Sequence, residues 1–123
     1  MDELRDKSGP WRGRWVQQAL RMSGSMRLQL HFAGVDIRGG GSDDSGAFTI
    51  DGSYDPATDQ VAITKSYPRL TVLYLGKWDG TMISGRSSII AAGFFDTGEF
   101  EMWPATEELS IGLSEIEELS SVG

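Results

Sequence analysis

Hydrophobic and polar residues alternate along most of the chain before Pro104. The clearest case is the run Met26–Phe32, in which every second residue is apolar and the residues between them are polar. A period of two is typical of a β-strand with one face buried and the other in solvent. Runs of this kind predict eight short strands, at Trp11–Gln18, Met26–Phe32, Val35–Arg38, Ala47–Asp51, Val61–Lys65, Leu70–Leu75, Thr81–Ile90 and Phe94–Trp103.

The connections between these strands are short and rich in turn-forming residues. Asp55–Asp59 contains a proline that suits a type I turn, and Asp79-Gly80 suits a tight hairpin. No connection is long enough for the crossover helix that parallel strands require. We therefore predict an all-β fold, an antiparallel up-and-down meander closed into a β-barrel of about eight strands. The longest flexible stretch, Gly39–Gly46, is expected to be a mobile surface loop or a lid over one end of the barrel.

The composition changes on either side of the predicted barrel. We expect a flexible N-terminus over residues 1–10, the barrel over 11–104 and a short acidic tail over 105–123. Apolar residues of the tail follow helical spacing, at Leu109, Leu113, Ile116 and Leu119. Because so short a segment does not hold a helix by itself, the tail either docks on the barrel, pairs with a partner or stays disordered.

Composition and charge exclude several classes of function. The chain has 123 residues, a net charge of −7 and no cysteine, so it has no disulfide, zinc–thiolate site or cysteine nucleophile. The negative charge repels nucleic acid and anionic lipid, and we expect no nucleic-acid partner. A local basic patch could still arise, but outward-facing charges on strands are the favoured interpretation of Arg12, Arg14, Arg21 and Arg27.

The length suits one domain that buries its own core. No apolar run approaches the ~18 residues that cross a bilayer, so no membrane span is predicted. The beginning of the chain lacks the apolar stretch of a signal peptide, which favours a cytoplasmic location.

The first predicted strand opens with Trp11-Arg12-Gly13-Arg14-Trp15. Gly13-x-Trp15 resembles the G-x-W signature that starts the first strand of calycin-type barrels, which are the lipocalins, the fatty-acid-binding proteins and the avidins. The resemblance implies a barrel in which the tryptophan closes one end and the cavity binds a small apolar or amphipathic molecule. The chain departs from these families in having no lipocalin T-D-Y turn motif, no cysteine pair and no room for the helix pair of the fatty-acid-binding proteins.

The seventh predicted strand has two faces with different chemistry. If Ser84, Arg86 and Ser88 faced the interior, a guanidinium between hydroxyls would form a carboxylate-binding site. If the alternate set with Ile83 and Ile89 faced inward, Arg86 would be a surface charge. The second set is smaller and more apolar, and it is the favoured interior.

Aromatic residues supply the other binding candidates. Trp78 lies at a predicted hairpin tip, where it either folds back over the barrel mouth or is exposed for recognition. Tyr67 and Tyr74, with Lys65, either have structural roles or form an isomerase-type site with a tyrosine as the acid. His31, on the polar side of its strand, is interpreted as a surface histidine rather than a metal or haem ligand.

The favoured function is a non-catalytic binding module that holds a small amphipathic or apolar molecule at the barrel mouth or in its interior. The candidate ligand-binding residues are Trp78, Tyr74, Arg86, Ser84, Ser88 and Tyr67. The alternative is a structural domain with a filled core, self-associating as a homo-oligomer through Leu70–Leu75, which is apolar on both faces. An isomerase is a minor alternative, and no catalytic residue, metal ion or cofactor is predicted.

Overall fold

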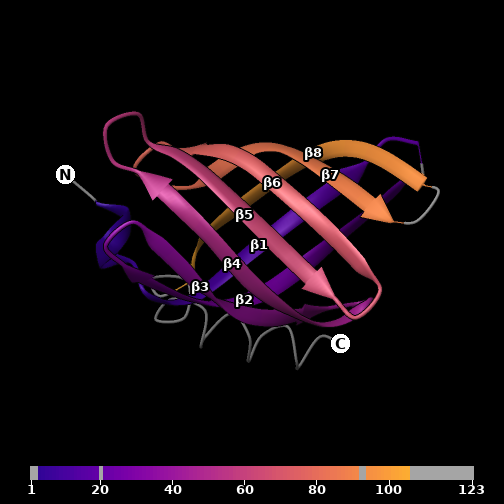
Figure 1. Ribbon diagram of the computed structural model, residues 1–123, viewed down its shortest axis with the longest axis horizontal. Helices are drawn as coiled ribbons and strands as arrows, with labels where there is room; N and C mark the ends of the chain where they lie inside the picture. The colour runs from indigo at the N-terminus through magenta and orange to yellow at the C-terminus, as the bar shows by residue number, and fades with distance from the viewer. Residues whose placement is uncertain (1–2, 20, 92–93, 106–123) are drawn as a thin grey trace, which may run out of the picture.

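The computed structural model describes residues 3–19, 21–91 and 94–105. A short 3₁₀ helix, η1 (Leu4–Asp6), precedes eight strands that cross the molecule in turn (Figure 1). The strands are β1 (Gly9–Gln17), β2 (Met22–Ala33), β3 (Asp36–Asp43), β4 (Gly46–Asp55), β5 (Gln60–Tyr67), β6 (Leu70–Trp78), β7 (Ile83–Ala91) and β8 (Phe94–Pro104). Most of them extend further than the alternating pattern indicates.

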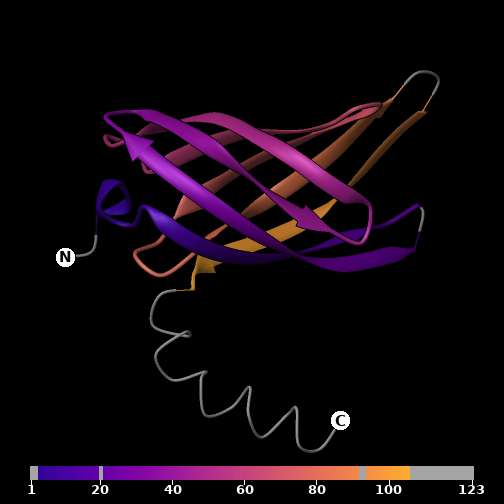
Figure 2. The same ribbon diagram turned by 90° about the horizontal axis from the view of Figure 1, so that it is seen from below.

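Each strand pairs antiparallel with the next, and β1 pairs with β8, so the sheet closes on itself. Figure 2 shows the strands crossing the barrel obliquely, the tilt that closure requires. The prediction of an all-β antiparallel meander barrel is confirmed. Closure removes the open edges that a flat sheet would present to other chains. Within the described ranges, no helix is long and apolar enough to span a bilayer.

The alternating pattern determines which side chains fill the barrel. In β2 the apolar positions Met26 and Phe32 are buried, whereas Arg27 and His31 on the other face are exposed. The same alternation buries an apolar residue at every second position in the first half of β4 and in the second half of β8. The interior is therefore filled largely by apolar side chains, which is usual for a barrel of this strand number.

The glycine-rich stretch is a strand and not a loop. The predicted loop or lid at Gly39–Gly46 is wrong, because β3 continues to Asp43 with pairing to both β2 and β4. A Cβ atom at Gly41 would lie 2.0 Å from the carbonyl oxygen of Arg27. Only glycine allows the two strands to approach so closely. The run of glycines therefore indicates close strand packing, and the turn itself is short.

Apolar side chains seal one end of the barrel. We call Leu4, Trp11, Phe32 and Trp78 the apolar plug. The ring centroid of Trp11 lies 6.0 Å from that of Trp78 and 5.7 Å from that of Phe32. Leu4 of η1 is fully buried in the same cluster. Leu4 of the N-terminal η1 thus packs into the barrel core. Trp78 takes the first of its two predicted alternatives and is folded inward, where it is buried.

Two of the three isoleucines of β7, Ile83 and Ile90, test the assignment of its faces. Ile83 is fully buried and Ile90 is 45% exposed. Ile83→Ala is expected to lower the free energy of unfolding by about 2–5 kcal/mol, because it removes buried methyl groups and leaves a cavity. The matched change Ile90→Ala should alter it by no more than about 0.5 kcal/mol. Urea unfolding followed by tryptophan fluorescence measures both, and equal losses would contradict the assignment.

Candidate functional site

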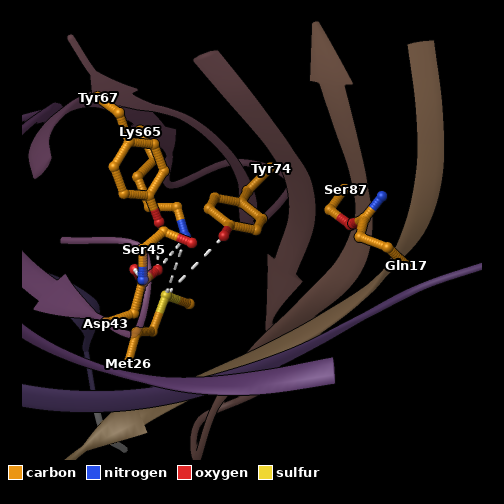
Figure 3. A network of polar contacts seen from close by, with 8 residues as sticks. All are labelled: Gln17, Met26, Asp43, Ser45, Lys65, Tyr67, Tyr74 and Ser87. Atoms are coloured by element: carbon orange, nitrogen blue, oxygen red, sulfur yellow. Dashed lines mark hydrogen bonds and ion pairs between the residues drawn. The ribbon is translucent and has the colours of Figure 1, made fainter. Parts of the chain in front are cut away.

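A layer of polar side chains crosses the barrel interior towards the end opposite the apolar plug. Its members come from five strands and point inward, as Figure 3 shows, and we call them the polar layer: Gln17, Asp43, Lys65, Tyr67, Tyr74 and Ser87. They occupy inward positions in strands whose other inward residues are apolar, such as Ile63 before Lys65 and Val72 before Tyr74. The alternation that builds the core therefore also carries these polar groups inside.

The polar layer contains an ion pair sealed from solvent. The Lys65 ammonium nitrogen lies 3.2 Å from Oδ2 of Asp43, and the two side chains are 2% and 1% exposed. The same carboxylate accepts a hydrogen bond from the hydroxyl of Tyr67 and one from the backbone N–H of Ser45 at 2.8 Å. Asp43 thus neutralises the buried lysine and uses its remaining acceptor capacity on neighbours, which is the condition under which a buried carboxylate is tolerated.

Aromatic rings surround the Lys65 ammonium group. Its Nζ atom lies 4.9 Å from the ring centroid of Phe48, 5.2 Å from that of Tyr67 and 5.3 Å from that of Tyr74. The ring of Trp15 is slightly further away, at 6.0 Å. These distances fall within the range of cation–π attraction, which is strengthened by the absence of water. The cage and Asp43 together compensate for the lost hydration of the lysine.

The environment shifts the proton equilibria of the polar layer. Burial lowers the pKa of Lys65, while the charge of Asp43 and its hydrogen bond act in the opposite direction. Burial raises the pKa of Tyr67 and of Tyr74, and the negative charge of Asp43 raises both further. Both tyrosines therefore keep their protons at neutral pH. They act as hydrogen-bond donors and not as bases.

Several donors in the interior are poorly used. The hydroxyl of Ser87 donates to Oε1 of Gln17 at 2.6 Å, which leaves the amide nitrogen of Gln17 buried without an acceptor in the described part of the chain. The indole nitrogen of Trp15 is in the same condition. Within the described ranges, the hydroxyl of Tyr74 donates to the sulfur of Met26 at 3.9 Å, and a thioether is a weak acceptor. The interior thus offers N–H and O–H groups to an oxygen acceptor.

The residues predicted as ligand-binding are divided between different places. Tyr67 and Tyr74 belong to the polar layer, whereas Trp78 lies in the apolar plug at the other end. Arg86 is exposed, and Ile83 and Ser87 of the alternate face are buried. The interior row of Ser84, Arg86 and Ser88 is therefore not formed. The face of β7 that carries Ile83 points into the barrel instead. If Arg86 were enclosed, its guanidinium would need an anion beside it in the interior.

Sequence reasoning missed four members of this region: Trp15, Gln17, Asp43 and Ser87. The sequence pattern predicts Asp43 to lie in a loop, because the glycines before it have no side chains that would show the alternation of apolar and polar residues. Continuing the period of two from the buried Ile37 would have assigned it an inward position. Ser87 shares the period of two with Ile83 and Ile89, but nothing in the sequence shows that it would meet Gln17 on β1.

The Gly13-x-Trp15 motif has a clear steric basis. A Cβ atom at Gly13 would lie 2.6 Å from the terminal methyl group of Met26, so glycine makes room for that side chain. Trp15 borders the Lys65 cage. The tryptophan that closes the barrel end is Trp11. The closed eight-stranded meander is compatible with a calycin-like barrel.

The chain matches no protein-family model and no curated protein sequence. Among the residues that the structure describes, no three histidine, aspartate or glutamate side chains gather to hold a metal ion. The polar layer itself supplies hydrogen-bond donors, an ion pair and aromatic rings.

The buried ion pair predicts a large effect of removing one partner. Lys65→Met should lower the free energy of unfolding by about 3–5 kcal/mol, because the carboxylate of Asp43 is left buried without its cation. Adding Asp43→Asn should recover part of that loss, since no uncompensated charge remains. Urea unfolding measures both.

An exposed ion pair serves as the matched control. Arg38 and Asp51 pair across β3 and β4 with side chains 61% and 66% exposed. Arg38→Met should cost less than about 1 kcal/mol. If Lys65→Met and Arg38→Met gave equal losses, the buried pair would not have the role described.

The tyrosines predict how stability responds to alkaline pH. Burial and the hydrogen bond to Asp59 raise the pKa of Tyr54 to about 12, and the pKa values of Tyr67 and Tyr74 are also raised. Unfolded tyrosines ionise near pH 10.0. Above that pH the folded state binds more protons, so the tyrosine contribution is fully present below pH 10.0 and is lost as the pH rises further.

Urea unfolding at a series of pH values, with tyrosinate absorbance recorded in parallel, tests this dependence. Tyr67→Phe with Tyr74→Phe should flatten the alkaline fall in the free energy of unfolding. Lys65 acts in the opposite sense below its ordinary pKa of 10.5, because a lowered pKa makes the unfolded state bind more protons there. An absorbance titration identical in the folded and unfolded protein would contradict the prediction.

Proposed function

We propose that the protein binds a small amphipathic molecule whose head group presents a carbonyl or carboxylate oxygen to the polar layer. One observation carries the proposal: the indole nitrogen of Trp15 and the amide nitrogen of Gln17 are both buried without an acceptor in the described residues. Each such donor costs about 1–3 kcal/mol when it is left unsatisfied. A ligand oxygen that accepts from them removes this cost.

The geometry of β1 supports a shared binding site for both donors. Trp15 and Gln17 occupy successive inward positions on the strand, about 7 Å apart along it. Tyr74 faces the same region, and its hydroxyl donates a hydrogen bond to the sulfur of Met26. All three groups donate, so the head group they select is an acceptor and not a second donor.

Apolar side chains at the same end of the barrel suit the rest of an amphipathic molecule. The exposed large hydrophobic residues include Val16 at the end of β1, Met22 at the start of β2 and the cross-strand pair Ile90 and Phe95. Phe95 is 65% exposed. The pairing of Ile90 with Phe95 places two exposed apolar side chains side by side, and adjoining exposed apolar groups suit contact with the apolar part of a ligand.

The polar layer supports binding without chemistry. The carboxylate of Asp43 already accepts from Lys65, Tyr67 and Ser45, and the tyrosines retain their protons at neutral pH. The carboxylate of Asp43 is thus already engaged by three donors of the chain, which favours the binding module. Protonated tyrosines are compatible both with hydrogen-bond donation to a ligand and with the acid of the isomerase alternative.

The second candidate is a structural barrel that self-associates. The filled interior favours it, as does Leu75 of β6, which is 61% exposed on the outer face. Under this alternative, ordered water satisfies the buried donors and small molecules leave them unchanged.

Heteronuclear NMR on ¹⁵N-labelled protein separates the two candidates. The four tryptophans each supply one indole N–H signal. Addition of hexanoate or hexanamide should shift the signal of Trp15, because its N–H gains an acceptor. Hexylamine, which brings a cation and no oxygen, should leave it in place. The two active compounds distinguish a carboxylate from a neutral carbonyl.

Internal controls are built into the chain. The indole nitrogen of Trp11 already donates to the carbonyl oxygen of Lys7 at 2.7 Å, so its signal should not respond. Trp15→Phe identifies the responding signal, and Trp103→Phe on β8 is the matched variant outside the layer. If neither oxygen compound moves the Trp15 signal, the binding proposal fails and the structural barrel remains.

A further inference from the structure

A separate feature lies on the outer surface over β4, β5 and β6, which run side by side (Figure 1). Two adjoining hollows of about 760 and 290 Å³ share Ser53, Ala62 and Leu75 in their linings. Leu73 also lines the smaller hollow. We call the outer surface of β5 and β6 the β5–β6 face. It lies outside the barrel and is independent of the interior donors on which the proposed function rests.

The β5–β6 face carries little charge. Among its outward residues only Lys77 is charged, although charged residues make up 24% of the chain. Leu75 is 61% exposed on it. The outward residues are Gln60, Ala62, Thr64 and Ser66 on β5 and Thr71, Leu73, Leu75 and Lys77 on β6. A depletion of charge around an exposed leucine is typical of the centre of a protein interface.

The two strands of this face differ in the size of their outward side chains. Ala62 on β5 stands directly opposite Leu75 on β6, and Thr64 stands opposite Leu73. The small residues of β5 leave room beside the leucines of β6, where the two hollows lie. Such a face is complementary to itself when its two sides are exchanged, because a leucine then meets a small residue.

Charges of opposite sign flank the β5–β6 face. On the β5 side, the outward residues of β4 include Asp51 and Asp55. Asp51 pairs with Arg38 on β3, and its side chain is still 66% exposed. On the β6 side, Arg86 of β7 is exposed, and within the described part of the chain neither it nor Lys77 forms an ion pair. One flank is therefore acidic and the other basic.

We propose that the β5–β6 face binds a second copy of this chain about a two-fold axis that runs along the seam between β5 and β6. Such an axis brings the same patch of both copies together and exchanges its two sides. Leu75 of each copy then lies over Ala62 of the other copy, and Leu73 lies over Thr64. Each leucine fills space that the smaller residue leaves open.

The same axis matches the two flanks by charge. Ser53 on β4 and Arg86 on β7 belong to one cross-strand row, one strand beyond the face on either side. Arg86 of each copy therefore lies over Ser53 of the other copy, between the carboxylates of Asp51 and Asp55. Because one axis satisfies both the shape and the charge of the face, the occupant is a second copy of this chain.

Sedimentation velocity of the full chain over a range of concentrations tests the proposal. The unsubstituted protein should form dimers as its concentration rises to about 500 μM. Leu75→Glu should raise the dissociation constant at least about tenfold, because it buries a carboxylate in the contact. Leu75 is exposed, so its substitution leaves the core intact. Val16→Glu, at a residue 52% exposed on β1, is the matched control and should leave the constant unchanged.

A double-mutant cycle between Arg86 and Asp51 tests the orientation of the two copies. In one barrel β4 and β7 are three strand spacings apart, roughly 14 Å along the sheet, so these residues cannot form an ion pair within one copy. Arg86→Gln and Asp51→Asn should each raise the dissociation constant about three- to tenfold in low salt, and the double variant should cost little more than either. Arg27→Gln, an exposed arginine of β2, should be additive with Asp51→Asn.

Three results would overturn the proposal: a monomer at every concentration up to about 500 μM, a dimer that Leu75→Glu leaves intact, or additive effects of Arg86→Gln and Asp51→Asn. The dimer is compatible with either candidate function. The indole signal of Trp15 should respond to hexanoate in the Leu75→Glu monomer as it does in the dimer, so the failure of one proposal leaves the other unaffected.

Discussion

The buried ion pair between Lys65 and Asp43 is the constraint around which the interior of this barrel is arranged. A lysine can remain charged inside a protein only when a counter-charge and polarisable groups replace its water. Asp43 supplies the counter-charge, and it reaches the interior only because β3 continues through its glycines instead of ending before them. Tyr67, also on β5, donates to the same carboxylate. One charged residue thus explains a glycine-rich strand, an enclosed aspartate and a ring of aromatic neighbours.

The two ends of the barrel follow different physical rules. At one end, Trp11, Trp78 and the N-terminal Leu4 exclude water by packing alone. At the other end, polar groups form hydrogen bonds with one another, and the buried nitrogens of Trp15 and Gln17 have no acceptor among the described residues. This division makes a barrel with a filled core compatible with a binding role, because the recognition chemistry is concentrated in a single layer instead of an extended cavity. It also explains why residues proposed on general grounds of aromaticity, such as Trp78 and Tyr74, have unrelated environments.

Strand number, order and most of the core could be predicted from the sequence, because alternation between apolar and polar residues is visible wherever both faces carry side chains. The glycines of β3 hide this alternation, because they have no side chains to mark the period. The burial of Lys65 is not visible in the sequence either, because a charged residue in an alternating run is normally assigned to solvent. The contact between Gln17 and Ser87 was beyond reach for a different reason. It joins strands far apart in the chain, and only the closed topology brings them together.

Closure of the barrel also determines the order in which the chain can fold. Neighbouring strands form hairpins through short turns, and such local contacts are made quickly. The pairing of β1 with β8 instead joins the two ends of the domain. The conformational entropy of nearly the whole strand-forming region must therefore be lost before this pairing contributes favourable free energy. During synthesis the barrel cannot close until β8 has left the ribosome. Until then β1 presents an open edge beside an unfinished apolar interior, and this interval is when the nascent chain is most exposed to aggregation and most dependent on chaperones.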